Sequence, residues 1–315
     1  ERGLLTLHRR ELSASDVAAA ALVFAHTGDP GTDRAVARVA EQYNRLCVVT
    51  EAPPVPVFDA ATPGRVIIVG GGPGNPDLLT VAGHRALACA DVVVTDRLAP
   101  VGVLADLAPH ADIIDVSKIP GGRRTEQSTI NALLVEHATA GRTVVRFKGG
   151  DGFVFGRGGE ELDHCLRAGV AVDVIPGVSA SIAAPAAALI PVTHRGLTQG
   201  FTVVSGHVPP GHPESTIDYT ALARANTTIV LMMAVANLDA ITAALTDAGL
   251  DPATPAAVIA DGCLPSQRHV RATLATIAQA ARFARIGPPA TTVIGAVAGF
   301  VPGQPVDAPV LRMQA

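Results

Sequence analysis

The sequence predicts an α/β protein in which strands and helices alternate through successive units. Apolar runs such as RVIIV and TVVRFK alternate with segments of helical period along most of the chain. Hydrophobic residues make up 48% of the 315 residues and charged residues 17%, which suits large buried cores and is too apolar for disorder. A proline-rich segment, APPVPVFDAATPG, separates a short first unit from the rest.

The first unit, residues 1–62, is predicted to be partial and Rossmann-like. AALVFAHT reads as a strand, DRAVARVAEQYN as a helix and RLCVVT as a second strand. The unit lacks a leading strand with a G-x-G-x-x-G loop, which is the usual seat of a dinucleotide pyrophosphate.

A second unit, residues 63–196, opens at Arg65. Its predicted helices are Pro76–Ala90, Thr125–Ala140, which stops at Gly141, and Glu160–Ala168. The predicted strands are RVIIV, DVVVTDR, ADIIDVSK, TVVRFK and AVDVI.

A third unit, residues 197–303, repeats the α/β pattern and precedes a short tail, residues 304–315. Leu238–Ala248 and Leu274–Phe283 are predicted helices. The predicted strands are FTVVSG, TTIVLMMA, PAAVIADG and TTVIGAV. Two successive α/β units are expected to leave a cleft between them, which is the default place for a ligand.

Composition excludes several classes of partner. Aromatic residues are 3%, Trp is absent and the net charge is −4, which argues against nucleic acid or an anionic membrane. The uncharged stretch Val174–Val192 contains three prolines, so we expect a strand end, a turn and a buried helix rather than a membrane span. The four cysteines form no C-x-x-C pair and ERGLLTLHRR lacks an apolar signal segment, so we expect a reducing, cytoplasmic compartment.

Two glycine-rich loops follow predicted strands. The first, Gly70 to Asn75, resembles a dinucleotide loop but has Asn75 at the third glycine position, and Pro73 removes an N–H donor. The second, RFKGGDGFVFGRGGEEL, places six glycines in its first fifteen residues, together with Asp151, Arg157, Glu160 and Glu161. Dense glycine indicates that the backbone closely approaches another group or a ligand. The Asp151 carboxylate is suited to binding hydroxyls, an amine or a cation.

These segments carry a family resemblance. VGGGPGNPDLLTVAGHRALACADVVVTDRL, VVRFKGGDGFVFGRGGEEL and VIPGVSASIAAPAAALIPVTHRG are similar to characteristic segments of uroporphyrinogen-III C-methyltransferases, members of the tetrapyrrole methylase family. The resemblance runs from about Arg65 to Val301. The first unit resembles the end of the dehydrogenase domain that is fused to such enzymes in siroheme synthases.

The resemblance implies the tetrapyrrole methylase fold, with S-adenosylmethionine between two α/β halves and S-adenosylhomocysteine as its product. The implied reaction methylates two pyrrole β-carbons of uroporphyrinogen III to give precorrin-2, for siroheme or cobalamin. A proton must then leave a bridging carbon, which requires a base. By position, Asp96 matches the family's base and Lys118 its proton donor; a homodimer is also implied.

The resemblance also assigns residues to the two ligands. The implied cofactor contacts are Pro73, Gly149, Gly150, Asp151, Val154, Ser179, Ala180, Met233 and Gly262. The substrate carries many carboxylates, for which arginine is the preferred partner. The candidates are Arg97, Lys118, Arg123, Arg124, Arg157 and Arg195, with His194 and His207 in reserve.

The chain departs from the family pattern at several positions. Asn75 stands for the usual Asp, Gly152 for Pro, and LMMAV for a Tyr-Met-Gly segment. Gly28-Asp29-Pro30 replaces Asp-Asp-Pro, so the acid associated with dehydrogenase and chelatase activity is missing, and we expect neither activity from this chain.

Three other functions stay open at this point. A methylase of a later corrinoid precursor would use the same fold. A nicotinamide-dependent oxidoreductase would change the absorbance of NAD without methyl transfer, and a silent binding module would bind S-adenosylmethionine without turnover.

Overall fold

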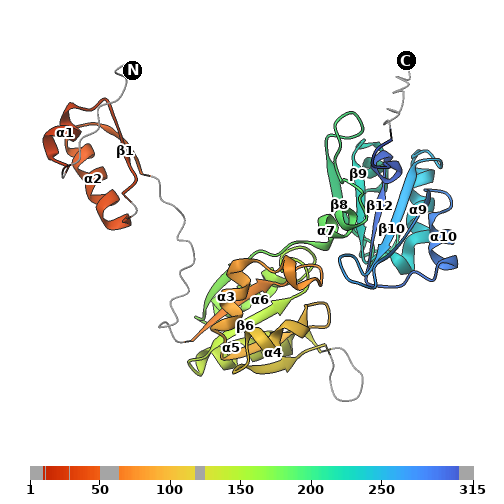
Figure 1. The fold of residues 1–315 in the computed structure, drawn as a ribbon, viewed down its shortest axis with the longest axis horizontal. Coiled ribbons are helices and arrows are strands. Elements are labelled where there is room, and N and C mark those ends of the chain that lie inside the picture. The colour runs from red at the N-terminus through yellow and green to blue at the C-terminus, as the bar shows by residue number, and fades with distance from the viewer. Residues whose placement is uncertain (1–9, 11, 28, 50–63, 118–124, 305–315) are drawn as a thin grey trace. The chain divides into compact units, whose positions relative to one another are not determined.

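The computed structural model describes residue 10 and residues 12–27, 29–49, 64–117 and 125–304. The chain forms two compact units, Glu1–Val57 and Phe58–Ala315. Figure 1 colours the smaller unit red and the larger one orange to blue. The larger unit contains two five-stranded sheets, called here the first sheet and the second sheet.

The smaller unit has the predicted strand–helix–strand core. Its elements are α1 (Ala14–Ala19), β1 (Leu22–Ala25), α2 (Pro30–Gln42) and β2 (Leu46–Val49). The two strands are parallel, with Leu22 opposite Leu46. Asp29 caps α2 by accepting a hydrogen bond from the Thr32 N–H at 2.8 Å, which satisfies a free amide at the helix start.

The first sheet is parallel and has the order β5-β4-β6-β3-β7. Every residue of β3 and β6 is buried, as expected for a parallel sheet covered on both faces. The strands are β3 (Arg65–Gly70), β4 (Val92–Thr95), β5 (Asp112–Asp115), β6 (Thr143–Lys148) and β7 (Ala171–Ile175).

Helices cover both faces of the first sheet. On one face, α5 (Gln127–Thr139) and α6 (Gly158–Arg167) contribute Leu134 and Cys165 to the core. On the other face, α3 (Val81–Ala88) contributes Leu87 and α4 (Leu104–Leu107) contributes Leu104. The predicted helix Pro76–Ala90 is instead a 3-10 turn, Pro76–Leu78, followed by α3, because Thr80 starts the helix by accepting from the Gly83 N–H at 3.0 Å.

The second sheet is mixed and has the order β11-β10-β12-β9-β8. Strands β8 and β9 are parallel, and the other neighbours are antiparallel. Its strands are β8 (Phe201–Ser205), β9 (Thr228–Met232), β10 (Pro255–Ala260), β11 (Arg268–Thr273) and β12 (Ala290–Ile294). Its helices are α7 (Ala180–Ala187), α8 (Tyr219–Arg224), α9 (Leu238–Asp247) and α10 (Ile277–Phe283).

Two cores sandwich the second sheet. Leu222, Ile241 and Ile277 from α8, α9 and α10 pack on one face, and Ala184 of α7 packs on the other. Figure 1 shows α7 beside this sheet. Val174–Val192 is a strand end, a turn and a helix, as predicted, and no helix within the described ranges is both long and apolar enough to cross a membrane.

Candidate active site

Three loops meet at one edge of the first sheet. Strand β3 lies between β6 and β7, and all three run in the same direction, so their carboxyl ends share one edge. In parallel α/β sheets this edge is where ligands bind. The loops are residues 71–75 after β3, 149–157 after β6 and 176–179 after β7.

Glycine lets the backbones of these loops touch each other. A Cβ placed on Gly177 would lie 2.2 Å from the carbonyl oxygen of Gly150, and one on Gly70 would lie 2.5 Å from the Gly177 nitrogen. No side chain fits at such distances. The Gly72 N–H donates to the Gly150 oxygen at 3.1 Å, and the Gly150 N–H donates back to the Gly72 oxygen at 2.6 Å. The close backbone approach that the glycines predict is therefore an approach of these loops to one another.

The Asp151 carboxylate holds two of these loops together. Its Oδ1 accepts a hydrogen bond from the Phe153 N–H at 2.8 Å, and its Oδ2 accepts one from the Gly177 N–H at 2.9 Å. The sequence alone suggests that this carboxylate meets a hydroxyl, an amine or a cation. In the structure the Asp151 carboxylate accepts hydrogen bonds from backbone amides and fixes the relative position of the two loops.

One side of this loop cluster is open. Gly150 has φ +66°, and the atoms nearest to its Cβ position are Ala180 N at 3.9 Å and Ser179 Cα at 4.0 Å. Ser179 caps α7 through its hydroxyl, which accepts from the Ser181 N–H at 3.3 Å. The exposed Val154 belongs to the same loop as Gly150. The structure brings together the predicted cofactor residues Pro73, Gly149, Gly150, Asp151, Val154, Ser179 and Ala180.

Asp96 lies beside this glycine surface. Its Oδ1 accepts from the Leu98 N–H at 3.1 Å and its Oδ2 from Arg146 Nη2 at 3.2 Å. A Cβ on Gly149 would lie 2.5 Å from the Leu98 oxygen, so the turn that carries Asp96 rests on Gly149. The Asp96 side chain is 27% exposed and can still reach a ligand.

Behind Asp96 lies a buried charge cluster made of Arg146, Lys148 and Glu161. Arg146 Nε donates to Glu161 Oε1 at 2.9 Å. Lys148 Nζ donates to the same oxygen at 3.1 Å and lies 3.0 Å from Oε2. Burial, followed by the neighbouring Arg146 charge, lowers the pKa of Lys148.

Sequence reasoning missed Arg146 and Lys148 and named Glu161 only among the polar residues near the glycines. The available signal was two cations two residues apart in the strand TVVRFK, because such residues point to the same face of a strand. Two cations on one buried face require a buried anion close by.

Strained backbone marks the predicted cofactor positions of the second sheet. Met233, directly after β9, has φ +56° and is 48% exposed. Gly262 lies between Asp261 at φ +51° and Cys263 at φ +70°. Such values are unfavourable for residues other than glycine and gather at functional sites.

Packing fixes the loop that carries Gly262. A Cβ there would lie 2.3 Å from the Ala184 Cβ, so α7 excludes any side chain. The Cys263 thiol donates to the Ala183 oxygen at 3.3 Å, and burial raises its pKa. A Cβ on Gly74 would lie 2.9 Å from Leu264, so the loop after β3 reaches the loop after β10.

The predicted substrate cations differ in their surroundings. Arg97 and Arg195 are exposed. Arg157 has φ +58° and pairs with Glu160 through Nε and Nη2, each at 2.8 Å from a carboxylate oxygen. Lys118, Arg123 and Arg124 lie outside the described residues.

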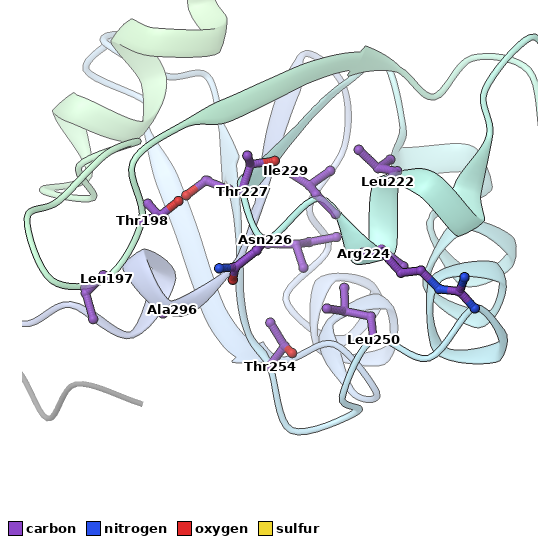
Figure 2. A pocket seen from close by; sticks show the side chains of 13 residues that line it. Leu197, Thr198, Leu222, Arg224, Asn226, Thr227, Ile229, Leu250, Thr254 and Ala296 are labelled. Atoms are coloured by element: carbon purple, nitrogen blue, oxygen red, sulfur yellow. The ribbon is translucent and has the colours of Figure 1, made fainter. Parts of the chain in front are cut away.

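A cavity of about 180 Å³ lies elsewhere in the larger unit, and Figure 2 shows the side chains that line it. Thr198, Asn226 and Thr254 are among the residues that line it. It lies at the start of β9, whereas Met233 follows the end of that strand, and no predicted site residue lines it. Across the described ranges, no group of His, Cys, Asp or Glu side chains is arranged to hold a metal ion.

Two sequence profiles match the chain. The profile described as Tetrapyrrole (Corrin/Porphyrin) Methylases matches residues 65–278. A second, described as Putative NAD(P)-binding, matches residues 1–63.

Individual proteins are similar over the larger unit. A uroporphyrinogen-III C-methyltransferase of Synechocystis is 42% identical over 237 residues, which cover 75% of this chain and 90% of that protein. A siroheme synthase of Neisseria meningitidis serogroup B is 44% identical over 237 residues, 75% of this chain and 48% of that protein. Among solved structures, a Thermus thermophilus uroporphyrin-III C-methyltransferase complexed with S-adenosylhomocysteine has a TM-score of 0.64 and 40% identity, and the match covers 74% of this chain and 98% of that one.

Proposed function

The chain belongs to the tetrapyrrole (corrin/porphyrin) methylase family, and on that premise we propose that it methylates uroporphyrinogen III with S-adenosylmethionine, giving precorrin-2. Relatives at about 40% identity carry this activity in their names, and one similar structure contains S-adenosylhomocysteine. One observation of this chain supports the proposal above the others. The turn that carries Asp96 rests on Gly149, so a carboxylate lies next to the glycine surface that would hold the cofactor.

The residues of this edge fit the cofactor. S-adenosylmethionine, when bound, supplies an electrophilic methyl group on a sulfonium. Gly150 has no side chain and nothing closer than 3.9 Å at its Cβ position, so a ligand can approach the backbone there. Val154 at this edge and Met233 of the second sheet are apolar and partly exposed, and they offer surfaces on which an adenosyl group can pack.

Asp96 acts as the base in this proposal. Its two oxygens are held by the Leu98 N–H and by Arg146, which fixes the direction of the carboxylate. Each oxygen keeps lone-pair capacity for a further proton. Asp96 can therefore accept the proton that leaves the methylated substrate, and Lys118 is proposed as the matching proton donor.

Arginines around this edge are proposed to bind the substrate carboxylates. Arg97 directly follows Asp96 and is exposed, which suits an anchor beside the reacting carbon. Arg195 is also exposed. Arg157 already has a carboxylate partner, Glu160, and would exchange it for a substrate carboxylate. Arg123 and Arg124 complete the proposed set.

Assembly and location are part of the same proposal. We expect a homodimer in the cytoplasm, from the family resemblance and the scattered free cysteines. We also propose that residues 63–196 and 197–303 are the two subdomains of the methyltransferase, and that residues 1–62 form a separate unit.

The deciding experiment incubates the full chain anaerobically with uroporphyrinogen III and methyl-labelled S-adenosylmethionine. We expect two methyl groups per tetrapyrrole. Asp96→Asn should lower kcat by roughly 10²- to 10⁴-fold, the usual contribution of a general base, while the Kd for S-adenosylhomocysteine stays near the wild-type value.

Asp112→Asn is the matched control. Asp112 lies at the start of β5, far along the sheet from the carboxyl edge, and pairs with Arg142 at 3.0 Å. It should keep wild-type turnover. Absence of methyl transfer by the wild-type chain would refute the activity, whereas an Asp96→Asn variant that turns over normally would refute only the role of Asp96.

A further inference from the structure

A chain of charged groups leads from the protein interior to Asp96. We propose that Glu161 is a positioning residue that acts on Asp96 through the guanidinium of Arg146. This inference rests on the proposed function, because it takes Asp96 to be the base. Glu161 itself is 0% exposed and does not touch the open side of the site.

The Arg146 guanidinium connects the two carboxylates. Nε donates to Glu161 at 2.9 Å and Nη2 donates to Asp96 at 3.2 Å. Nη1 donates to the carbonyl oxygens of Val94 and Phe147, each at 3.2 Å. Because the guanidinium is a rigid plane with donors in fixed directions, holding Nε and Nη1 also fixes where Nη2 points. The orientation of the Asp96 carboxylate therefore depends on Glu161.

Glu161 also balances the charge next to Asp96. The cluster and Asp96 together contain two cations, Arg146 and Lys148, and two carboxylates. Without the Glu161 charge, Asp96 would be the only carboxylate among the described residues that pairs with Arg146. A cation that is 4% exposed needs a close anion, so Arg146 would bind Asp96 more tightly and hold its carboxylate against the guanidinium.

The far side of Glu161 is also fixed. Gln127 of α5 donates to Glu161 Oε1 at 3.1 Å and lies 2.9 Å from Asn131 Oδ1. Helices α5 and α6 thus both determine where the carboxylate lies.

An ion-pair cluster that served only stability would not need a partner at the protein surface. Buried ion pairs are often no more stabilising than well-packed apolar residues, so stability alone explains this cluster poorly. Asp96, which Arg146 of the cluster contacts, is partly exposed, at 27%, and faces the edge where the proposed cofactor loops meet. The cluster therefore ends at the proposed reacting groups.

A double-mutant cycle tests the inference in the full chain. Glu161→Gln keeps the shape and removes the charge; we expect kcat to fall on the order of tenfold to a hundredfold, with the KM for S-adenosylmethionine nearly unchanged. In an Asp96→Asn background the same change should have little further effect, because the residue through which Glu161 acts is already absent. Glu161→Asp should restore part of the lost kcat.

Asp173→Asn is the control for an ion pair of the same sheet. Asp173, in the middle of β7, pairs at 3.4 Å with Arg65, which begins β3 at the end opposite the loops. This variant should change the melting temperature without changing kcat in either background.

The outcomes separate the two proposals. If Glu161→Gln lowers kcat by the same factor in both backgrounds, Glu161 does not act through Asp96 and the inference is overturned, while the loss in Asp96→Asn still supports the base. If Asp96→Asn keeps wild-type kcat, both the base and the inference fall. Should Glu161→Gln fail to fold, Arg146→Lys enters the same cycle, since an ammonium keeps the charge but cannot hold both carboxylates as the planar fork does.

Discussion

The two sheets of the larger unit differ in what they bury. Arg65, Arg146, Lys148 and Glu161 are buried charged residues of the first sheet and its helices. In the described part of the second half, the buried polar side chains are Ser and Thr, and none is charged. Its candidate site residues are instead distinguished by backbone conformation, as at Met233. In the proposed site, the first sheet would therefore supply the charged groups and the second sheet the shape of the binding surface.

The glycine contact between loops of the first sheet should be the most sensitive feature. In Gly177→Ala the added methyl group would lie 2.2 Å from the Gly150 oxygen, and backbone cannot move away as a side chain can. We expect a loss of about 2–4 kcal/mol in the free energy of unfolding. The affinity for S-adenosylhomocysteine should fall at least tenfold, because the same contact shapes the proposed cofactor surface.

Urea denaturation and calorimetric titration measure these two effects. Gly159→Ala is the control, since Gly159 lies in α6 and nothing lies within 4 Å of its Cβ position. That variant should be slightly more stable than the wild type, as alanine is the better helix former. A stable Gly177→Ala protein with normal affinity would show that the loops are free to separate.

A smaller effect is expected from the buried Cys165 thiol of α6, which packs on the first sheet. Burial, followed by the charge of Glu161, raises the pKa of Cys165 from 9.0 to about 11. A raised pKa stabilises the fold fully below pH 9.0, and this contribution is lost as the pH rises through about 11. Between these values the wild type should lose about 1–2 kcal/mol more than Cys165→Ala.

Thermal unfolding measured at several pH values checks this prediction. Cys89→Ala, which changes an exposed thiol, should follow the wild type. Lys148 stays in all three proteins, so its lowered pKa, which acts in the opposite direction, cancels in the comparison. Parallel pH curves for wild type and Cys165→Ala would contradict the expected titration.

The sequence predicted the first sheet well, and the second less completely, for physical reasons. Parallel strands buried on both faces are continuous apolar runs, so β3, β4 and β6 were recognisable. The edge strand β11, RHVRAT, was missed because it is polar and largely open on one side. The six-residue helix α8 was missed because it is too short to show a helical period.

Sequence reasoning pointed to the candidate site but not to the contacts within it. Glycine density pointed to the loop after β6, and the family resemblance pointed to Asp96. Neither indicates that Asp151 bonds to the Gly177 amide, or that Arg146 joins Asp96 to Glu161. These contacts connect residues that are 15 to 50 positions apart, and only the sheet order brings them together.

The smallest effect concerns Met233, where substitutions should separate the contribution of the backbone conformation from that of the side chain. Met233 is at φ +56°, which glycine tolerates and a β-branched residue does not. Met233→Gly should be as stable as the wild type or gain up to about 1 kcal/mol, whereas Met233→Val should lose about 1 kcal/mol. Unfolding curves measure both values.

Cofactor affinity then shows what the side chain adds. Met233 is 48% exposed, and in the proposed site it packs against the adenosyl group, so Met233→Gly should bind S-adenosylhomocysteine a few-fold more weakly despite its stability. Asn226→Gly is the matched control, because Asn226 has a similar φ of +51° at the other end of β9. It should leave affinity unchanged. If Met233→Val is as stable as Met233→Gly, the strained conformation is not imposed by the fold, and the contrast between a charged first sheet and a shape-giving second one fails.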